Sequence, residues 1–153
     1  MKLCQNPMEH SGYAIERLSS GILLVSADGE VVNPMAIAWG FLGYQWSKPV
    51  FIAPVRTSRF SHPIIAKTRK FTVCVQPEEM DEVKAYCGQK SGRDVDKIKE
   101  LGLTTTSLGD FDVPVIDGCK LAYLCNVIHT ASAEPLSNHE FFFGEVSALY
   151  SDM

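Results

Sequence analysis

Apolar residues recur along the chain in short runs separated by turn residues, a pattern that predicts β-strands. The first run is Gly21–Ala27, and the pair Asp28 and Gly29 that follows it is typical of a hairpin turn leading into Glu30–Trp39. Pro34 lies inside this second run. Because proline has no N–H to donate to a ladder, we expect the strand to break, to bulge or to lie at a sheet edge there.

Four more runs have the composition of strands. They are Val50–Val55, with Pro54 marking a frayed end, and then Phe71–Val75, Lys120–Thr130 and Phe141–Tyr150. In Lys120–Thr130 the apolar residues fall on both parities, so this strand is predicted to be covered on both faces.

Helices are predicted only in the connections. Ser58 or Ser61 can cap a helix that has Pro63 in its first turn, and a second helix is expected to begin around Pro77. Asp94 is expected to cap a third helix, which runs to Leu101 and stops at Gly102. About six or seven mostly antiparallel strands with short helices between them predict a small closed or partly closed β-barrel.

Composition and charge support one globular unit. The chain has 153 residues, of which 46% are hydrophobic and 21% charged, and no linker or repeat divides it, so we predict a single domain over residues 1–153. The more charged stretch from Gln76 to Gly102 is interpreted as an insertion in that domain. The net charge of −4 predicts neither a nucleic-acid nor a membrane partner.

Targeting and metal signals are lacking. The first twenty residues contain no apolar core of a secretory signal, which predicts a cytoplasmic protein. The five cysteines are an odd number without a CxxC pair and are interpreted as reduced thiols, and no metal site is predicted. The four histidines are scattered and are interpreted as surface or strand-end residues. No catalytic side chain is predicted.

The densest polar segment is Arg56–Ser61, which leaves a predicted strand and enters a predicted helix. Its two guanidinium groups, its hydroxyls and the free N–H groups of a helix start suit a dianionic phosphate. A solvated loop with an ordinary N-cap explains the same residues, and composition alone favours neither interpretation.

Two further segments carry similar alternatives. Asn33–Trp39, followed by Phe41, Tyr44 and Trp46, has the features of a wall for a flat heteroaromatic ligand, or of a core strand with a bulge. Cys87–Lys97 combines a glycine-bearing loop with basic residues, so that Arg93 or Lys97 could complete an anion site. Sequence alone favours a solvated helix there.

Taken together, these segments resemble the flavin reductase-like, FMN-binding split-barrel family, and its flavoredoxin branch in particular. The resemblance rests on the motifs NPMAIAWG, SKPVFIAPVRTSRFSHPII, FTVCV and YCGQKSGRDVDK, and it spans the chain from about Glu16 to Tyr150. It implies a mainly β protein with a Greek-key split β-barrel and short peripheral helices. It also implies a homodimer that binds FMN noncovalently near the subunit interface.

The resemblance assigns roles to particular residues. It implies that the phosphate is bound by Arg56, Ser58, Arg59 and Ser61. It implies that the isoalloxazine is lined by Asn33, Pro34, Met35, Ala36, Ile37, Ala38 and Trp39. It also implies that Lys97 contacts the phosphate or the ribityl chain. The chain departs from the family pattern at Pro34 and Ala36, where valine and threonine are frequent, and at His62, where tyrosine is common. The connection from His129 to His139 is shorter than in many relatives.

The function that the resemblance implies is an FMN-dependent oxidoreductase passing electrons from NAD(P)H or a protein donor to an acceptor. Two alternatives stay open: an FMN-binding electron carrier without NAD(P)H activity, and a ligand-binding barrel without redox activity. The aromatic residues Trp39, Tyr44 and Trp46 supply more apolar surface than one small barrel rim should expose, which favours burial by a second subunit.

Overall fold

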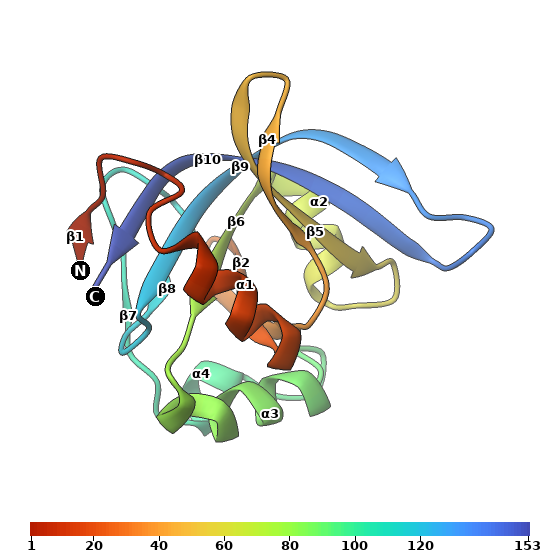
Figure 1. The fold of residues 1–153 in the computed structure, drawn as a ribbon. Helices are drawn as coiled ribbons and strands as arrows, with labels where there is room; N and C mark the ends of the chain where they lie inside the picture. Colours follow the sequence, from red (N-terminus) through yellow and green to blue (C-terminus); the bar gives the residue numbers. More distant parts are fainter.

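One large antiparallel sheet forms the body of the protein in a computed structural model that describes residues 1–153 (Figure 1). Its long strands are β2 (Ile22–Asp28), β3 (Val31–Ile37), β4 (Phe41–Gln45), β5 (Lys48–Arg56), β6 (Lys70–Val75), β9 (Leu121–Ser132) and β10 (His139–Ser151). They follow the order β3-β2-β6-β9-β10-β5-β4, and the short β1 (Lys2–Leu3) pairs with the end of β10. No ladder joins β3 to β4, although β3 contacts β5, so the curled sheet is a barrel left open on one side. The predicted partly closed β-barrel is confirmed.

Short helices surround this sheet. Helix α1 (Ser11–Ser20) precedes β2, and α2 (Ser61–Thr68) joins β5 to β6. The chain between β6 and β9 contains η1 (Glu78–Met80), α3 (Asp81–Gln89), α4 (Lys97–Glu100) and a two-stranded sheet of β7 (Thr105–Thr106) and β8 (Val115–Ile116). In Figure 1, α3 and α4 lie together at the bottom of the molecule. None of the helices is both long and apolar enough to cross a membrane.

The first half of β9 has both faces buried, as its sequence predicts, but Ile128 and His129 are exposed, so the predicted cover does not extend to Thr130. One parity, including Leu121, Tyr123 and Cys125, packs inside the barrel in a cluster of 20 buried residues. The other parity, Ala122 and Leu124, packs in a separate cluster of 11 buried residues to which β8 also contributes. The segment between β6 and β9 therefore covers the outer face of the sheet with a second core.

Pro34 and Pro54 lie where a missing N–H costs no ladder bond. Strand β3 is an edge strand, and the carbonyl of Pro34 points away from β2 to accept a hydrogen bond from Lys97. The strand passes through Pro34 with its register intact, so of the three expected outcomes the edge position is the observed one. Pro54 pairs with Phe141 of β10, and it lies beyond the ladder with β4, whose first residue Phe41 pairs with Ile52. The expected frayed end at Pro54 is wrong, because β5 continues to Arg56.

The sequence did not predict helix α1 and strand β4, nor the two-residue strands β1, β7 and β8. Helix α1 buries Ala14 and Leu18, which are four positions apart and share one helical face, but polar residues fill most of the remaining positions. Strand β4 is an edge strand with few buried residues, and its tight turn to β5 places Trp46 and Ser47 at φ 53 and 57.

The third predicted helix is shorter than expected. Asp96, and not Asp94, is its cap, and the Asp96 carboxylate accepts a hydrogen bond from the backbone N–H of Lys99 at 3.2 Å. The helix that follows spans only Lys97–Glu100. The second helix does begin near Pro77, first as η1 and then as α3.

Candidate functional site

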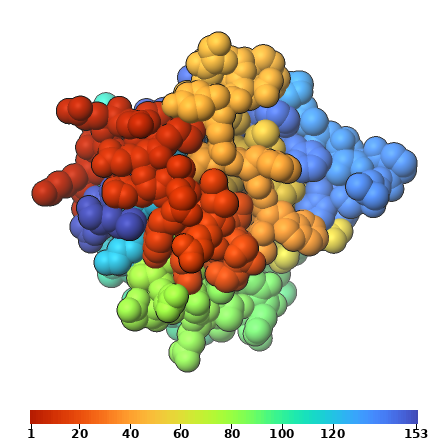
Figure 2. All heavy atoms as spheres, in the orientation of Figure 1, coloured from red at the N-terminus to blue at the C-terminus, as the bar shows by residue number.

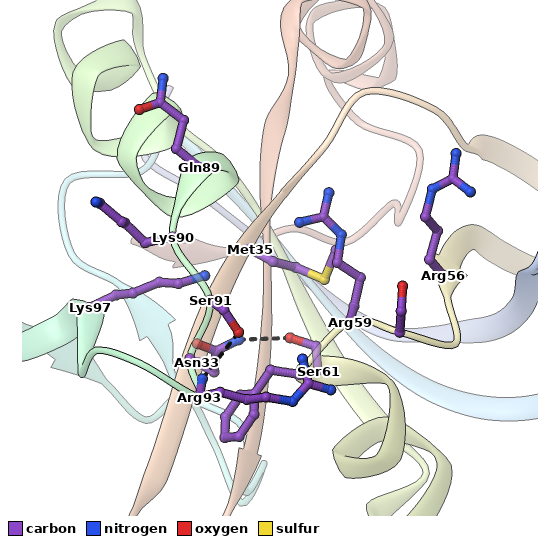
Figure 3. A pocket seen from close by; sticks show the side chains of 13 residues that line it. Asn33, Met35, Arg56, Arg59, Ser61, Gln89, Lys90, Ser91, Arg93 and Lys97 are labelled. Carbon is purple, nitrogen blue, oxygen red and sulfur yellow. Dashed lines mark hydrogen bonds between the residues drawn. The ribbon is translucent and has the colours of Figure 1, made fainter.

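A basic cavity of about 330 Å³ lies where β3, the end of β5, the start of α2 and the loop after α3 meet (Figure 3). Its lining is predominantly polar and consists of Asn33, Met35, Arg56, Ser58, Arg59, Phe60, Ser61, Gln89, Lys90, Ser91, Gly92, Arg93 and Lys97. In Figure 3, Arg59 and Lys97 reach from different elements toward the space around Met35. Chain segments far apart in the sequence therefore share one concave surface.

The charge of this cavity is wholly positive. Five lining residues, Arg56, Arg59, Lys90, Arg93 and Lys97, are cationic, and none of the lining residues is acidic. No carboxylate lies within 4.0 Å of any of these five cations, which is notable in a chain of net charge −4. Guanidinium groups that no carboxylate neutralises are suited to bind a phosphate through charge-assisted hydrogen bonds.

Buried polar groups form the floor of the cavity. Asn33 Nδ2 donates to Ser61 Oγ at 2.9 Å, and Lys97 Nζ donates to the carbonyl oxygens of Pro34 at 2.8 Å and Cys87 at 2.9 Å. Burial lowers the pKa of Lys97, an effect that Cys87 opposes and that the charge of Arg59 reinforces. Two of the three ammonium N–H groups of Lys97 are used in this way, and the Ser61 hydroxyl keeps its own proton to donate.

The loop after α3 approaches this floor closely at Gly92. A Cβ atom built at that position would clash with the ring of Phe60 and with Asn33 Oδ1. Only glycine allows the backbone to come so near. The close approach holds Ser91 and Arg93 on the rim of the cavity.

A second cavity, of about 310 Å³, continues from the first along β3. Met35, Arg56 and Arg59 line both cavities, and the remaining walls of the second are Ala36, Ile37, Ala38, Trp39, Pro54 and His139. We call this second cavity the β3 groove. One continuous depression thus has a basic end and a less polar end.

His139 stands at the far end of the β3 groove. Its ring centroid is 5.4 Å from that of Trp39, and its Nδ1 lies 2.8 Å from Ser137 Oγ. The same Oγ accepts the backbone N–H of His139 at 3.4 Å. Burial lowers the pKa of His139, and the charges of Arg56 and Arg59 lower it further. The imidazole is therefore neutral at pH 7.

The structure brings nearly all of the predicted site residues together. Arg56, Ser58, Arg59, Ser61 and Lys97 line the basic cavity, and Asn33, Met35, Ala36, Ile37, Ala38 and Trp39 line one or both cavities. Pro34 lines neither cavity, and its contribution is a carbonyl oxygen that accepts a hydrogen bond from Lys97.

Sequence reasoning underestimated two parts of the site. The loop carrying Lys90 and Arg93, for which the sequence favoured a solvated helix, lines the basic cavity. His139, interpreted as a surface or strand-end residue, is the first residue of β10 but is buried, and it faces Arg56 in the register of β10 with β5. No local motif marks His139; only the strand pairing places it in the site.

Comparison with known proteins identifies the family. The model of the flavin reductase-like domain matches residues 15–152. The chain belongs to this family. This match confirms the resemblance inferred from the motifs. A comparison with curated proteins found no significant match.

Solved structures of flavin reductase-like proteins share the fold. Flavoredoxin from Methanosarcina acetivorans is 28% identical, with a TM-score of 0.76 over 86% of this chain and 68% of the other. An FMN-binding protein from Thermus thermophilus, crystallised with p-hydroxybenzaldehyde, is 25% identical with a TM-score of 0.76 over 86% and 71%. An FMN-binding domain of a flavin reductase-like enzyme from Shewanella baltica shares the fold at 18% identity, with a TM-score of 0.81 over 98% and 76%. Membership of this family supports a redox function that involves a flavin.

Proposed function

We propose that this protein binds FMN with its phosphate in the basic cavity and its isoalloxazine along the β3 groove, and that it works as an FMN-dependent oxidoreductase. The observation that carries the proposal is the continuity of the two cavities through Met35, Arg56 and Arg59. A molecule with an anionic tail and a flat ring system matches a depression that is basic at one end and half apolar at the other.

The residues of the basic cavity fit a terminal phosphate. Arg59 and Arg93 offer guanidinium donors, while the Ser61 hydroxyl and the third N–H of Lys97 remain free to donate from the floor. Such a concentration of donors at one end suits the dianion of a monoester better than the bridging pyrophosphate of FAD.

The chain itself contributes binding and orientation. Bound FMN would supply the electron-transfer chemistry, so no side chain of the protein needs to form a bond with a substrate. Asn33 ties β3 to α2, and Lys97 of α4 ties β3 to α3, so these two side chains fix the geometry of the cavity. The neutral His139 lies at the far end of the groove and adds no charge there.

The cofactor test is direct. The purified protein should be yellow and should release FMN, not FAD, on denaturation. Arg59→Ala should weaken FMN binding about tenfold or more, because a charge-assisted hydrogen bond to a phosphate contributes about 1.5 to 3 kcal/mol. A protein without a flavin band, or one that binds FAD more tightly, would contradict the assignment.

The electron donor separates the first two functional alternatives. Rapid anaerobic bleaching of the flavin by NADH or NADPH would support a reductase that uses a nicotinamide, whose ring would have to stack on an exposed flavin face because the chain has no dinucleotide fold. Bleaching by a reduced protein donor alone would support an electron carrier. A colourless protein that binds another ligand would support the third alternative, a barrel without redox activity.

We further propose a two-fold homodimer with FMN near its interface. Trp46 packs against His129 and Phe143, with ring centroids 5.5 Å apart in both cases, yet 53% of its surface is exposed, and Tyr44 is 64% exposed. The β4–β5 hairpin that carries both residues projects at the top of Figure 2. Sedimentation should give about twice 16.9 kDa, and Trp46→Glu should weaken both dimerisation and FMN retention. A stable monomer that keeps FMN would contradict this placement.

A further inference from the structure

An apolar groove of about 650 Å³ opens from the β3 groove, away from the basic cavity. The two share Ala38, Trp39, Pro54, Arg56 and His139, and the walls added beyond them include Ile15, Leu18, Phe41, Leu136 and Phe141. Leu136 is 93% exposed and Phe41 is 65% exposed, although both are large apolar side chains. We call this third depression the acceptor groove.

We propose that the acceptor groove binds a quinone, which takes electrons from FMN held in the β3 groove. This inference rests on the proposed function. Its ligand is a planar, neutral molecule with an apolar ring system and carbonyl oxygens. Every wall of the groove can be matched to one of these features.

The apolar walls account for the ring system. Trp39 and Phe41 offer aromatic faces, and Leu136 joins them from the loop between β9 and β10. Covering these exposed side chains with a flat ring removes apolar surface from water, which stabilises the complex. The groove contains no acidic residue and no lysine that a charged ring substituent would need as a partner.

The polar end of the groove accounts for a carbonyl oxygen. Ser137 Oγ accepts the backbone N–H of His139, and in the tautomer in which the Ser137 hydroxyl donates to Nδ1 the ring proton lies on Nε2. Nε2 has no partner in the protein and can donate. Arg56 donates to Asn138 Oδ1 at 2.7 Å and has further N–H groups to spare. Two donors therefore meet where the acceptor groove joins the β3 groove.

Reducibility decides between a quinone and a carboxylate. A carboxylate would also suit Arg56, but it cannot accept electrons from a reduced flavin. The reduction of one quinone to its hydroquinone takes up two electrons and two protons, and the oxidation of one fully reduced FMN to FMN releases the same number of each. The exchange balances without a further reactant.

The test uses the FMN-loaded protein and a probe that cannot alkylate thiols. 2,3-Dimethyl-1,4-naphthoquinone is substituted at both ring carbons open to thiol addition, and 2,3-dimethylnaphthalene has the same skeleton without the carbonyls. With FMN oxidised and no donor present, equilibrium dialysis should give saturable binding of the quinone. The hydrocarbon should bind about fivefold or more weakly, since it lacks a hydrogen bond worth about 1 kcal/mol.

Variants then locate the site. Leu136→Asp should weaken quinone binding about tenfold or more and leave FMN content unchanged, because Leu136 lines only the acceptor groove. Leu3→Asp is the matched control, since Leu3 is 62% exposed on β1 and lies outside the groove, and it should bind like the wild type. His139→Phe should reduce the preference for the quinone over the hydrocarbon, because it removes one of the two donors.

Each contrary result has a distinct meaning. A wild type that retains FMN but binds no quinone, or a Leu136→Asp variant with unchanged quinone affinity, would overturn this inference and leave the proposed function standing. Sedimentation of the same samples shows whether a second copy of the chain occupies the groove. If the quinone does not bind and Leu136→Asp converts dimers to monomers, the groove is a subunit interface. That result would also overturn the inference. A protein that holds no FMN would overturn the proposed function and this inference together.

Discussion

Asn33 Nδ2 donates a hydrogen bond to Ser61 Oγ at 2.9 Å, and both side chains are almost completely buried. The bond ties the edge strand β3 to the first residue of α2, so it joins the two walls of the basic cavity. A buried amide N–H without a partner would cost more than the bond contributes. The geometry of the cavity therefore depends on a contact between residues that are distant in sequence.

Ser61→Ala is expected to reduce the free energy of unfolding by about 1 to 3 kcal/mol, because it leaves the buried amide of Asn33 without its acceptor. Urea titration of the FMN-free protein measures this change. Ser58→Ala is the control: Ser58 lines the same cavity but is exposed, and the stability of that variant should match the wild type. Equal stabilities for all three proteins would show that the Asn33–Ser61 bond contributes nothing.

Gly92→Ala is expected to push the loop after α3 away from Phe60 and Asn33, since the added Cβ has no room. Displacing Ser91 and Arg93 from the cavity should weaken FMN binding about tenfold or more, the effect of losing a charge-assisted hydrogen bond. Fluorescence titration of FMN into the cofactor-free protein measures the affinity. Gly43→Ala is the control, because a Cβ at Gly43 meets nothing within 4 Å. An unchanged affinity in Gly92→Ala would mean that the loop does not contact the phosphate.

Asp81→Asn is expected to destabilise the protein by about 1 kcal/mol at pH 7, a modest effect because this carboxylate is partly exposed. The guanidinium of the buried Arg17 donates to Asp81 and to the carbonyl oxygen of Gln76. Burial tends to raise the pKa of Asp81, but hydrogen bonds from Arg17 and Gln76 and the charges of Arg17 and Lys84 outweigh it and leave the pKa below its ordinary value of 3.8.

The pH dependence of that effect follows from its sign. A carboxyl group with a lowered pKa in the folded state stabilises the fold above its ordinary pKa and loses this contribution as the pH falls. The difference in stability between wild type and Asp81→Asn should therefore be constant down to about pH 4 and shrink below it. Asp28→Asn, which removes the exposed Lys67–Asp28 ion pair, should show little effect at any pH. A pH-independent difference would contradict the assignment.

His139→Gln is expected to flatten the stability profile between pH 7 and pH 5. Because the pKa of the buried His139 lies below its ordinary value of 6.5, the unfolded chain takes up a proton in this range before the folded one does. The wild type should lose stability relative to the variant as the pH falls through 6.5. Denaturant titrations at several pH values on cofactor-free protein measure the difference. A constant difference from pH 8 to pH 5 would show that His139 titrates normally.

Local sequence determined several features of this protein. The Asp28–Gly29 pair specified the β2–β3 hairpin, and apolar residues on both parities of β9 specified a strand with two buried faces. Pro34 was compatible with an edge strand because it lacks an N–H. The segment Arg56–Ser61 concentrated cations and hydroxyls at a strand-to-helix junction. In each case the residues that carry the information are neighbours in the chain, so spacing and side-chain chemistry suffice to interpret them.

The way in which these parts combine depends on contacts between distant segments of the chain. His139 enters the site because β10 pairs with β5 in a register that sets it opposite Arg56, and no pattern around His139 encodes that register. The loop around Gly92 joins the site because it packs on Phe60 and on Asn33. Strand β4 and helix α1 form on few buried residues and are stabilised by the sheet that they contact. These features depend on contacts between distant segments, whose free energy is gained only once the barrel has closed around its core.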